Sequence, residues 1–201
     1  IINFRRFEKF KIDKSIKKSK KITLFYFGMV AERRGIFETI NSFRNILIKG
    51  FNVKLLIIGP TDKADSYKFF QLINSSYLKN NIEYIPWIDL SEILTYLKIS
   101  DICLAPFLKN EQHESGVANK IYQYMFGKKP IIASNCTPQA KLIKSFECGL
   151  IFSNQNEFEE KIIIYLKDSN LRKKMGNNGF VNLYKKYDSN KFNFSLLNLY
   201  N

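Results

Sequence analysis

Six short apolar runs alternate with stretches of helical periodicity between residues 22 and 187, and this alternation constrains the fold more than any other feature. Each run is apolar throughout, as in strands that are buried on both faces of a parallel sheet. A helix between two such strands forms a right-handed crossover. The sequence therefore predicts a Rossmann-like, doubly wound α/β sheet of about six parallel strands with helices on both faces. The predicted strands are Ile22–Phe27, Val53–Gly59, Ile82–Ile85, Asp101–Pro106, Pro130–Ser134 and Cys148–Phe152.

The helical stretches are recognised by apolar residues at every third or fourth position. The first runs from Ile36 to Leu47, and Gly50 follows as a candidate C-terminal cap. In sheets of this kind, ligands bind at the carboxyl ends of the strands, near the point where the strand order reverses. The loops after the first, second, fourth and fifth strands are therefore the candidate binding loops. Further helices are predicted over residues 64–78, 90–97, from near 117, 157–166 and 171–187.

The chain carries a net charge of +14, and half of it lies before the first strand. Residues 1–21 contain nine Lys and Arg against Glu8 and Asp13, a net charge of +7. We therefore predict a basic leader or interdomain segment over residues 1–21 and one Rossmann-like domain over residues 22–201. A run of charges is usually a solvated segment, and the alternative is attraction to an anionic membrane or to nucleic acid.

Neither targeting signals nor the three cysteines point to a specific function. The sequence has no apolar run long enough to span a membrane and no signal-peptide pattern. Cys103, Cys136 and Cys148 lack the close spacing of metal ligands, and we interpret them as reduced structural thiols of a cytosolic protein. The first residue is not Met and the opening reads as mid-chain, so we expect a fragment of a larger protein.

The loop after the first strand, GMVAERRG (Gly28–Gly35), holds two adjacent arginines at the start of a helix. It lacks the GxGxxG dinucleotide fingerprint, and the sequence contains no GxxxxGKS/T phosphate loop. Free amides and the dipole at a helix N-terminus attract anions, and an arginine adds a forked donor suited to phosphate. Arg33 and Arg34 therefore indicate an anion site, unless both are simply solvated in a turn.

A second candidate loop precedes the helix that is predicted from near Val117. Val117, Ile121 and Met125 form an i, i+4, i+8 stripe that should face the sheet, so the polar residues gather at the N-terminal end. Gly116 would let a ligand approach the backbone, where the first amides of the helix are free to donate. Glu114 would either cap this helix or face a sugar hydroxyl or a developing positive charge beside a bound diphosphate.

Seven segments, none of them specific alone, occur together in one known family. They are YFGMVAERRG, LLIIGP, NNIEYIPWI, LKISDICLAPF, ESGVANKIYQYMFGKKPIIAS, ECGLIF and LRKKMGNNG. In their order and spacing, the chain resembles the C-terminal, nucleotide-sugar-binding domain of a GT-B-fold glycosyltransferase of the retaining family-four, or group 1, type. The resemblance covers roughly residues 22–187.

The resemblance implies roles for residues at matching positions. Arg34 matches the basic residue that holds the donor diphosphate, whereas Met29 stands where the family has a second basic residue. Glu114 is assigned as the catalytic acid, although the family's spacing to the acid on the next helix points to Ser115. Gln123 stands at that second acidic position, where it would bind the ribose as a neutral acceptor.

The remaining implied contacts are backbone or loop positions. The expected diphosphate contacts beside Arg34 are Gly28, Gly116, Val117 and Ala118. The expected nucleotide contacts beside Gln123 are Gly59, Trp87 and Ile88. Further candidates are His113, Ser115, Arg33 and Lys120. An isolated loop histidine is more often solvated than in contact with phosphate or sugar, so we expect a solvated ring at His113.

The resemblance also implies a reaction. The parent enzyme is expected to transfer a sugar from a nucleoside-diphosphate sugar, with retention, to a glycan or lipid-linked acceptor in bacterial surface polysaccharide biosynthesis. The N-terminal, acceptor-binding domain is absent from these residues, so donor binding without transfer is an expected behaviour of the domain alone. The expected location is the cytoplasm, with peripheral contact at the inner face of the membrane as a variant.

The sequence has no Asp-x-Asp metal motif, and the resemblance implies that no metal and no cofactor are needed. A helix dipole and an arginine would stabilise the leaving group instead. The alternative from another class is a basic, non-catalytic binding module on a Rossmann-like scaffold, with nucleic acid or an anionic membrane as its partner. That module would show steep salt dependence and little dependence on nucleotide identity. Under the favoured interpretation no nucleic acid is bound.

Overall fold

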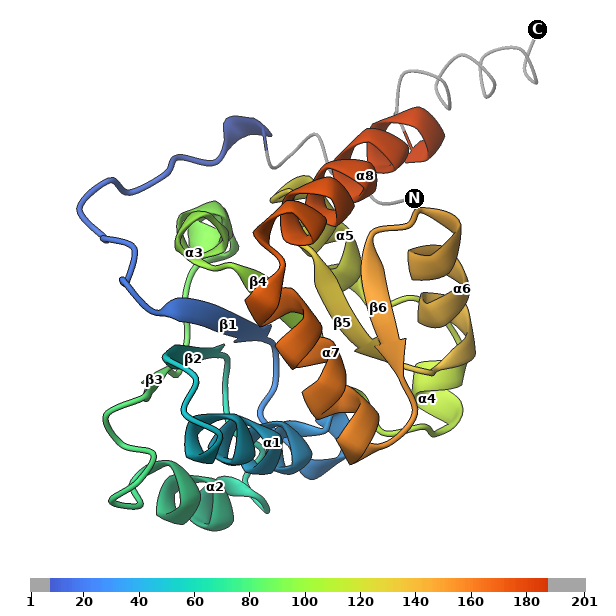
Figure 1. The fold of residues 1–201 in the computed structure, drawn as a ribbon. Helices are drawn as coiled ribbons and strands as arrows, with labels where there is room; N and C mark the ends of the chain where they lie inside the picture. The colour runs from blue at the N-terminus through green and yellow to red at the C-terminus, as the bar shows by residue number, and fades with distance from the viewer. Residues whose placement is uncertain (1–7, 188–201) are drawn as a thin grey trace, which may run out of the picture.

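The structure is a computed structural model and describes residues 8–187 (Figure 1). Its centre is a six-stranded sheet in which all neighbours pair in parallel, in the order β3-β2-β1-β4-β5-β6. This confirms the predicted doubly wound fold, and all predicted strands are found, some of them one residue shorter at an end. The strands are β1 (Ile22–Phe27), β2 (Val53–Ile58), β3 (Ile82–Ile85), β4 (Ile102–Ala105), β5 (Ile131–Ser134) and β6 (Gly149–Phe152).

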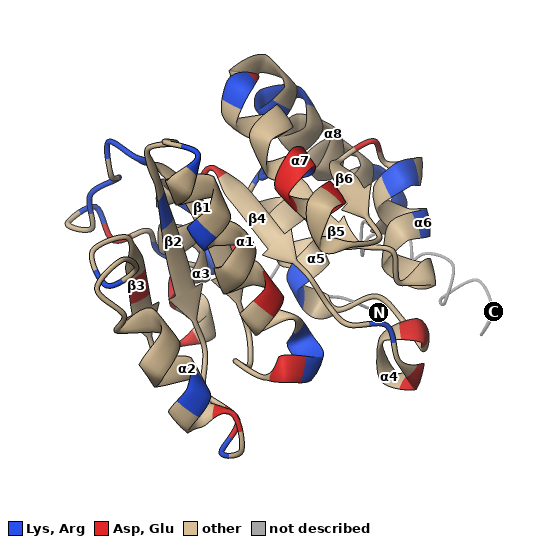
Figure 2. Ribbon diagram, turned by 60° about the horizontal axis from the view of Figure 1, so that its bottom comes forward, with Lys and Arg blue, Asp and Glu red and all other residues tan. Residues whose placement is uncertain are grey.

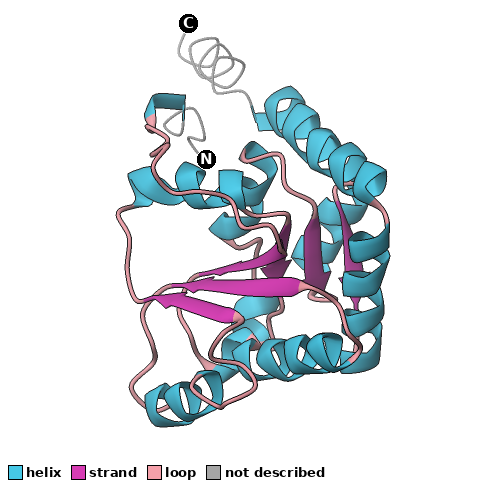
Figure 3. Cartoon of the chain, turned by 60° about the vertical axis from the view of Figure 1, so that its left-hand side comes forward, coloured by secondary structure: helices cyan, strands magenta, loops and turns pink. Residues whose placement is uncertain are grey.

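Helices cover both faces of the sheet (Figure 3). Successive strand residues point to opposite faces, so Leu24 and Tyr26 of β1 belong to one core and Phe25 to the other. The first core is covered by α1 (Ile36–Ile48), α2 (Ser66–Ile73) and α7 (Gln155–Lys167). The second is covered by α3 (Ile93–Ile99), α5 (Asn119–Phe126), α6 (Thr137–Ser145) and α8 (Ser169–Tyr187).

Some short elements are not evident from the apolar pattern. They are η2 (Glu32–Arg34), α4 (Glu111–Glu114) and α6, although Pro138 in the first turn of α6 is a helix-start signal. A further short element, η3 (Leu90–Glu92), leads into α3. The helix predicted over residues 64–78 is too long, because α2 ends at Ile73 and Asn and Ser residues follow it. Such side chains hydrogen-bond to nearby backbone and favour turns.

The strand order reverses between β1 and β4, and Tyr124 of α5 lies where these two strands part. Their pairing reaches Tyr26 opposite Leu104. One residue further on, the hydroxyl of the fully buried Tyr124 accepts a hydrogen bond from the Phe27 amide at 3.1 Å and donates one to the Leu104 carbonyl at 3.2 Å. One side chain therefore satisfies two backbone groups at the point where strand pairing ends.

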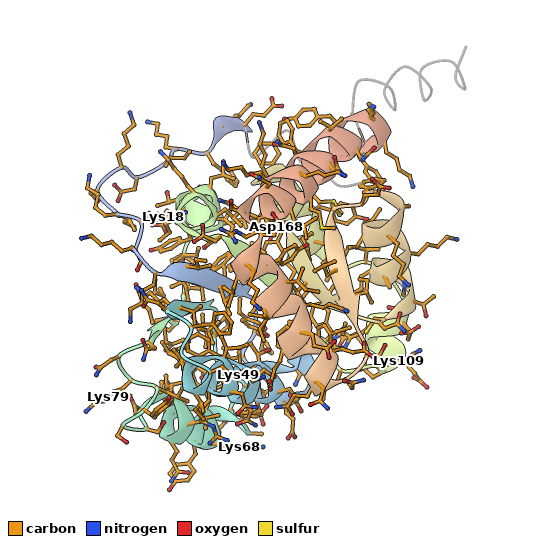
Figure 4. The ribbon with its side chains drawn as sticks, viewed as in Figure 1. Lys18, Lys49, Lys68, Lys79, Lys109 and Asp168 are labelled. Atoms are coloured by element: carbon orange, nitrogen blue, oxygen red, sulfur yellow. The ribbon has the colours of Figure 1, made fainter. Side chains whose placement is uncertain are left out.

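The described part of the predicted basic segment, residues 8–21, packs against the domain. Ile16 contacts the core on the α5 side of the sheet. Lys18 pairs with Asp101 at 2.5 Å, close to α3 (Figure 4). The boundary predicted at residue 22 stays a prediction, and the outer ends of both predicted ranges lie outside the described residues.

Two sequence observations can be followed in the fold. Between residues 8 and 187, no helix combines the length and the apolar composition needed to cross a membrane. Cys103, Cys136 and Cys148 are all buried free thiols, as expected for structural cysteines.

Gly35 fixes the close approach of η2 to the end of β4. Its φ is 73°, and a Cβ at this position would lie 1.7 Å from the Pro106 carbonyl oxygen. Gly35→Ala should lower the free energy of unfolding by about 3 kcal/mol or more, from left-handed strain plus the collision with backbone. Urea denaturation followed by circular dichroism measures this loss.

Gly50→Ala is the matched control, because Gly50 has a φ of 85° but open space around its Cβ position. Its loss should be about 1–2 kcal/mol, the cost of the left-handed conformation alone. Equal losses for the two variants would show that the contact of Gly35 with Pro106 does not limit stability.

Candidate functional site

The carboxyl ends of β1 and β4 border an open cavity of about 270 Å³, in the part of the molecule that Figure 2 turns toward the viewer. The loop after β1, the loop after β4 and the segment leading into α5 contribute its walls. Open α/β sheets bind their ligands at this place. The sequence-predicted residues that line the cavity are Arg34, His113, Ser115, Gly116, Val117 and Ala118.

Arg34 is the last residue of η2, and its side chain lines the cavity. Its Cζ lies 5.4 Å from the ring centre of Phe107, and its buried Nε has no hydrogen-bond partner among the described residues. Arg33 is engaged elsewhere: Nη1 pairs with Asp62 at 2.7 Å, and Nη2 lies 3.1 Å from the Met29 sulfur. Of the two adjacent arginines, only Arg34 reaches the cavity.

The segment before α5 leaves backbone donors unused. α5 begins at Asn119, slightly later than predicted, and Ala118 occupies the N-cap position without a side chain able to cap the helix. Within residues 8–187, the amides of Val117 and Ala118 donate no hydrogen bond. The positive end of the helix dipole and two free amides therefore lie at the cavity wall. Gly116 completes this wall, with nothing within 4 Å of its Cβ position.

Glu114 ends α4 and contacts α6. Its Oε1 accepts a hydrogen bond from the Thr137 amide at 3.1 Å, and the Nζ of Lys109, labelled beside α4 in Figure 4, lies 3.9 Å away. The Thr137 hydrogen bond, helped by Lys109, holds the pKa of Glu114 below its ordinary value, so the carboxylate is ionised at neutral pH. It binds the N-terminus of α6 and not that of α5. Glu114 itself does not line the cavity, and its catalytic role stays a prediction.

His113 is 6% exposed, so the expectation of a solvated histidine is wrong. Its ring stacks on Phe107 with centres 4.5 Å apart, and Nδ1 lies 2.7 Å from the Leu108 carbonyl oxygen. Since a carbonyl can only accept, Nδ1 carries the proton of the neutral ring. The buried Nε2, which has no hydrogen-bond partner in the described part of the chain, presents a lone pair. Burial lowers the pKa of His113, and the charges of Arg34 and Lys120 lower it further.

Lys120 and Gln123 lie one helical turn apart on α5, and each is 8% exposed. Neither the Lys120 Nζ nor the Gln123 Oε1 has a hydrogen-bond partner within the described part of the chain. The ammonium lies over the rings of Tyr26 and Phe107, 4.3 and 4.8 Å from their centres. Because a polar atom buried without a partner costs free energy, both side chains are candidates for ligand contact.

Phe107, Gln112 and Gln139 also line the cavity and are not predicted from the sequence as site residues. Of these three, Phe107 contacts the most predicted residues. It is 3% exposed, and its ring contacts the side chains of Arg34, His113 and Lys120. Its only sequence signal is its place directly after the fourth strand. An apolar residue at that place is not distinguishable from an ordinary core residue.

Lys120, Gln123 and the remaining predicted nucleotide contacts do not line this cavity. Gly28 directly follows β1 with a φ of 126°, and a Cβ there would lie 3.2 Å from the Lys120 Nζ. Gly59 packs on Gly28, since its own Cβ would lie 2.1 Å from the Gly28 carbonyl oxygen. Trp87 is 69% exposed after β3, whereas Ile88 belongs to the core. Contacts of these residues with a nucleotide stay predictions.

A second cavity, of about 260 Å³, lies at the carboxyl ends of β4, β5 and β6. Phe152 and Phe158 are among its apolar walls, and Glu38 contributes a buried carboxylate oxygen, Oε2, that has no hydrogen-bond partner among the described residues. A carboxylate repels the anions that the unpartnered cations near Phe107 attract. Lys109 and Phe107 also line this second cavity, but the cavity beside β1 has Arg34 and no carboxylate among its described lining residues. The cavity beside β1 therefore suits an anionic ligand better.

Fold and site together define a class: Rossmann-like α/β domains with anion-attracting groups at the reversal of strand order. The sequence profile of one family within this class, Glycosyl transferases group 1, matches residues 7–181. The chain belongs to this family.

Individual relatives agree with the assignment. The chain is 26% identical over 206 residues to the capsular polysaccharide biosynthesis glycosyltransferase CapM of Staphylococcus aureus, covering 98% of this chain and 52% of CapM. It therefore spans about half the length of that relative.

Solved structures show the same fold. The C-terminal domain of the glycosyl transferase group 1 family protein LpcC from Francisella tularensis matches 90% of this chain and 97% of its own, with a TM-score of 0.75 and 22% identity. Anabaena HepE (Alr3699) in complex with UDP-glucose matches 90% of this chain and 48% of its own, with a TM-score of 0.76 and 14% identity.

His113 is the only histidine of the sequence, so its titration can be followed by NMR without overlap. We expect a pKa below 6.5, because burial disfavours the charged ring. Below about pH 6.5 the unfolded chain binds this proton more readily than the folded one, so stability should fall as the pH falls.

His113→Gln is the control, because it removes the titrating group and should make the loss of stability between about pH 7 and 5 smaller. A pKa at or above 6.5 in the free protein would contradict the buried, neutral ring.

Proposed function

We propose that this domain binds a nucleoside-diphosphate sugar, the donor substrate of a glycosyltransferase. The observation that carries the proposal is the set of donor groups at the carboxyl ends of β1 and β4 that have no hydrogen-bond partner among residues 8–187. They are the Arg34 Nε, the Lys120 Nζ and the amides of Val117 and Ala118. Guanidinium, ammonium and helix N-terminal amides are the groups with which proteins bind phosphate. Membership of the group 1 family supports the same class of ligand.

In the proposed complex the diphosphate lies between Arg34 and the start of α5. The guanidinium would donate a forked pair of hydrogen bonds, and the free amides would donate at the positive end of the helix dipole. These interactions strengthen as negative charge develops on the departing diphosphate, so they lower the barrier to sugar transfer. We propose no metal and no cofactor in this role, since the cations of the chain supply the charge.

The sugar and the ribose would contact the neighbouring side chains. Glu114 would orient the donor sugar or stabilise positive charge that develops near its anomeric carbon. A carboxylate has room for further hydrogen bonds beside the one from Thr137. The unpartnered Oε1 of Gln123 would accept a hydrogen bond from a ribose hydroxyl.

We propose that the full-length enzyme transfers the sugar with retention to a glycan or lipid-linked acceptor in surface polysaccharide biosynthesis. The likeness to CapM supports this setting, and the chain covers 52% of that protein. A second domain would bind the acceptor and close over the donor. The cavity of about 270 Å³ is at the small end of ligand pockets, as suits a half-site. The proposed location is the cytoplasm, with peripheral contact at the inner face of the membrane.

The net charge of +14 raises a second candidate, a module that binds nucleic acid or an anionic membrane. Figure 2 shows Lys and Arg spread over many elements of the ribbon, not gathered on one face. Lys18 and Lys49 are also paired with carboxylates. The donor site is therefore favoured, and steep salt dependence without nucleotide preference would support the module instead.

Arg34→Ala should weaken the binding of UDP or GDP by about 1.5–3 kcal/mol, the scale of a hydrogen bond to a charged group. Isothermal titration calorimetry at moderate salt measures this change. One of the two diphosphates is expected to bind much more tightly than its monophosphate, because the monophosphate lacks the second anionic group.

Arg33→Ala is the matched control: it removes the same charge one residue away, from a side chain that is paired with Asp62. Its affinity should stay near that of the wild type. Equal affinity of Arg34→Ala and wild type would contradict the role of Arg34. Failure of both UDP and GDP to bind would contradict the proposed function.

A further inference from the structure

Lys120 is a buried lysine that forms no ion pair within residues 8–187. Its side chain is 8% exposed, and within residues 8–187 its Nζ has no hydrogen-bond partner. The ammonium lies against the faces of Tyr26 and Phe107 and close to Gly28 at the end of β1. Aromatic faces attract a cation but compensate only part of the cost of removing it from water.

The titratable groups around Lys120 supply no negative charge at neutral pH. Arg34 on η2 adds a second positive charge, and His113 on α4 is neutral. Burial raises the pKa of the Cys103 thiol on β4 and of the phenols of Tyr26 on β1 and Tyr124 on α5, so all three stay protonated. Two cations thus share one apolar environment without an anion between them, which is an unfavourable arrangement until an anion binds.

The proton on Lys120 is consequently held weakly in the free protein. Burial, and next the charge of Arg34, lowers the pKa of Lys120 to about 7. Near neutral pH a large fraction of the molecules therefore carries a neutral amine at this position. A polyanion beside the amine would reverse the effect of Arg34 and favour the charged form.

We propose that Lys120 is a second ligand of the diphosphate beside Arg34, and that it takes up a proton when the nucleoside diphosphate binds. The proton moves from water or buffer to the lone pair of the Nζ atom, and no bond to the ligand is made or broken. This inference rests on the proposed function and adds to it a binding residue and a dependence on pH. Because proton uptake becomes harder as the pH rises, affinity for the diphosphate falls above about pH 7.

The coupling between protonation of Lys120 and diphosphate binding also favours one side of the sugar-transfer reaction. The nucleoside diphosphate that leaves carries one more ionisable phosphate oxygen than the sugar-linked donor does. A protonated Lys120 therefore stabilises the product side of sugar transfer more than the donor. Lys120 would act in this way as a binding group for the leaving diphosphate, together with Arg34.

Calorimetry in two buffers tests the proposal on the wild-type chain. UDP and GDP are titrated at pH 8 in Hepes and in Tris, whose ionisation enthalpies differ. The dependence of the observed enthalpy on that of the buffer gives the protons taken up per ligand bound. At pH 8 the ligand phosphates, with a pKa near 6, are already ionised, so the uptake belongs to the protein. We expect close to one proton at pH 8 and much less near pH 6.

Lys120→Met should abolish this uptake at pH 8 and weaken diphosphate binding about tenfold or more. Lys129→Met is the matched control. Lys129 is a partly buried lysine that also has a lowered pKa, but its Nζ donates a hydrogen bond to the Ser100 carbonyl at 2.7 Å. It precedes β5, at the opposite end of the sheet. This variant should keep the uptake and the affinity of the wild type.

The outcomes separate the two proposals. Diphosphate binding to the wild type at pH 8 without proton uptake would overturn the inference and leave the donor site standing. Uptake retained in Lys120→Met would overturn it too, because the proton would then belong to another group such as His113. Absence of binding by both diphosphates at pH 6 and at pH 8 would overturn the proposed function together with the inference. If Lys120→Met does not fold, the wild-type measurement decides alone.

Discussion

The hydroxyl of Tyr124 sits where β1 and β4 stop pairing, and the geometry of the site depends on it. In a doubly wound sheet, the strands on either side of the reversal send their connections to opposite faces, so the backbone groups at their ends lose their partners. Tyr124 binds one such group on each strand, the Phe27 amide and the Leu104 carbonyl. Lys120 precedes Tyr124 by one turn on the same face of α5. The helix whose tyrosine binds the ends of β1 and β4 therefore also places the Lys120 amine beside the end of β1.

The groups around Phe107 are held together at a cost to stability. A guanidinium, an ammonium and an imidazole contact one ring, and each has a nitrogen without a partner among residues 8–187. Proteins keep such unsatisfied groups mainly where a ligand satisfies them. The neighbouring backbone is fixed just as closely, since Gly35 meets the Pro106 carbonyl with no room for a Cβ. Arg34 is therefore held at the cavity by the backbone that follows it.

The candidate site was predictable where it depends on local chain chemistry. Local chemistry indicated the pair Arg33 and Arg34, because basic residues at a helix start favour an anion, and the family resemblance selected Arg34. Local chemistry also indicated Gly116–Ala118, because a helix N-terminus has free amides. The sequence named His113 as a candidate but could not predict its burial, since that burial depends on the ring of Phe107, which follows β4. The hydrogen-bond partner of Glu114 could not be predicted either, because the Thr137 amide belongs to α6, which follows β5 in the chain.

The sequence by itself determined the parallel sheet, the buried stripe of α5 and the loops that carry the site, because apolar periodicity and helix termini are local properties of the chain. Ile121 and Met125 are fully buried, as their spacing requires. Val117, predicted as the first residue of this stripe, precedes α5, is partly buried and lines the cavity. Tertiary structure alone decided which polar groups are buried from solvent and which of them contact each other. Arg33 and Arg34 are chemically identical neighbours, yet Arg33 pairs with Asp62 whereas Arg34 packs against the ring of Phe107. Lys120 is buried only because residues distant in sequence, such as Tyr26 and Phe107, pack against it in the fold. The loss of water around its amine and the nearness of the Arg34 charge therefore follow from tertiary structure alone.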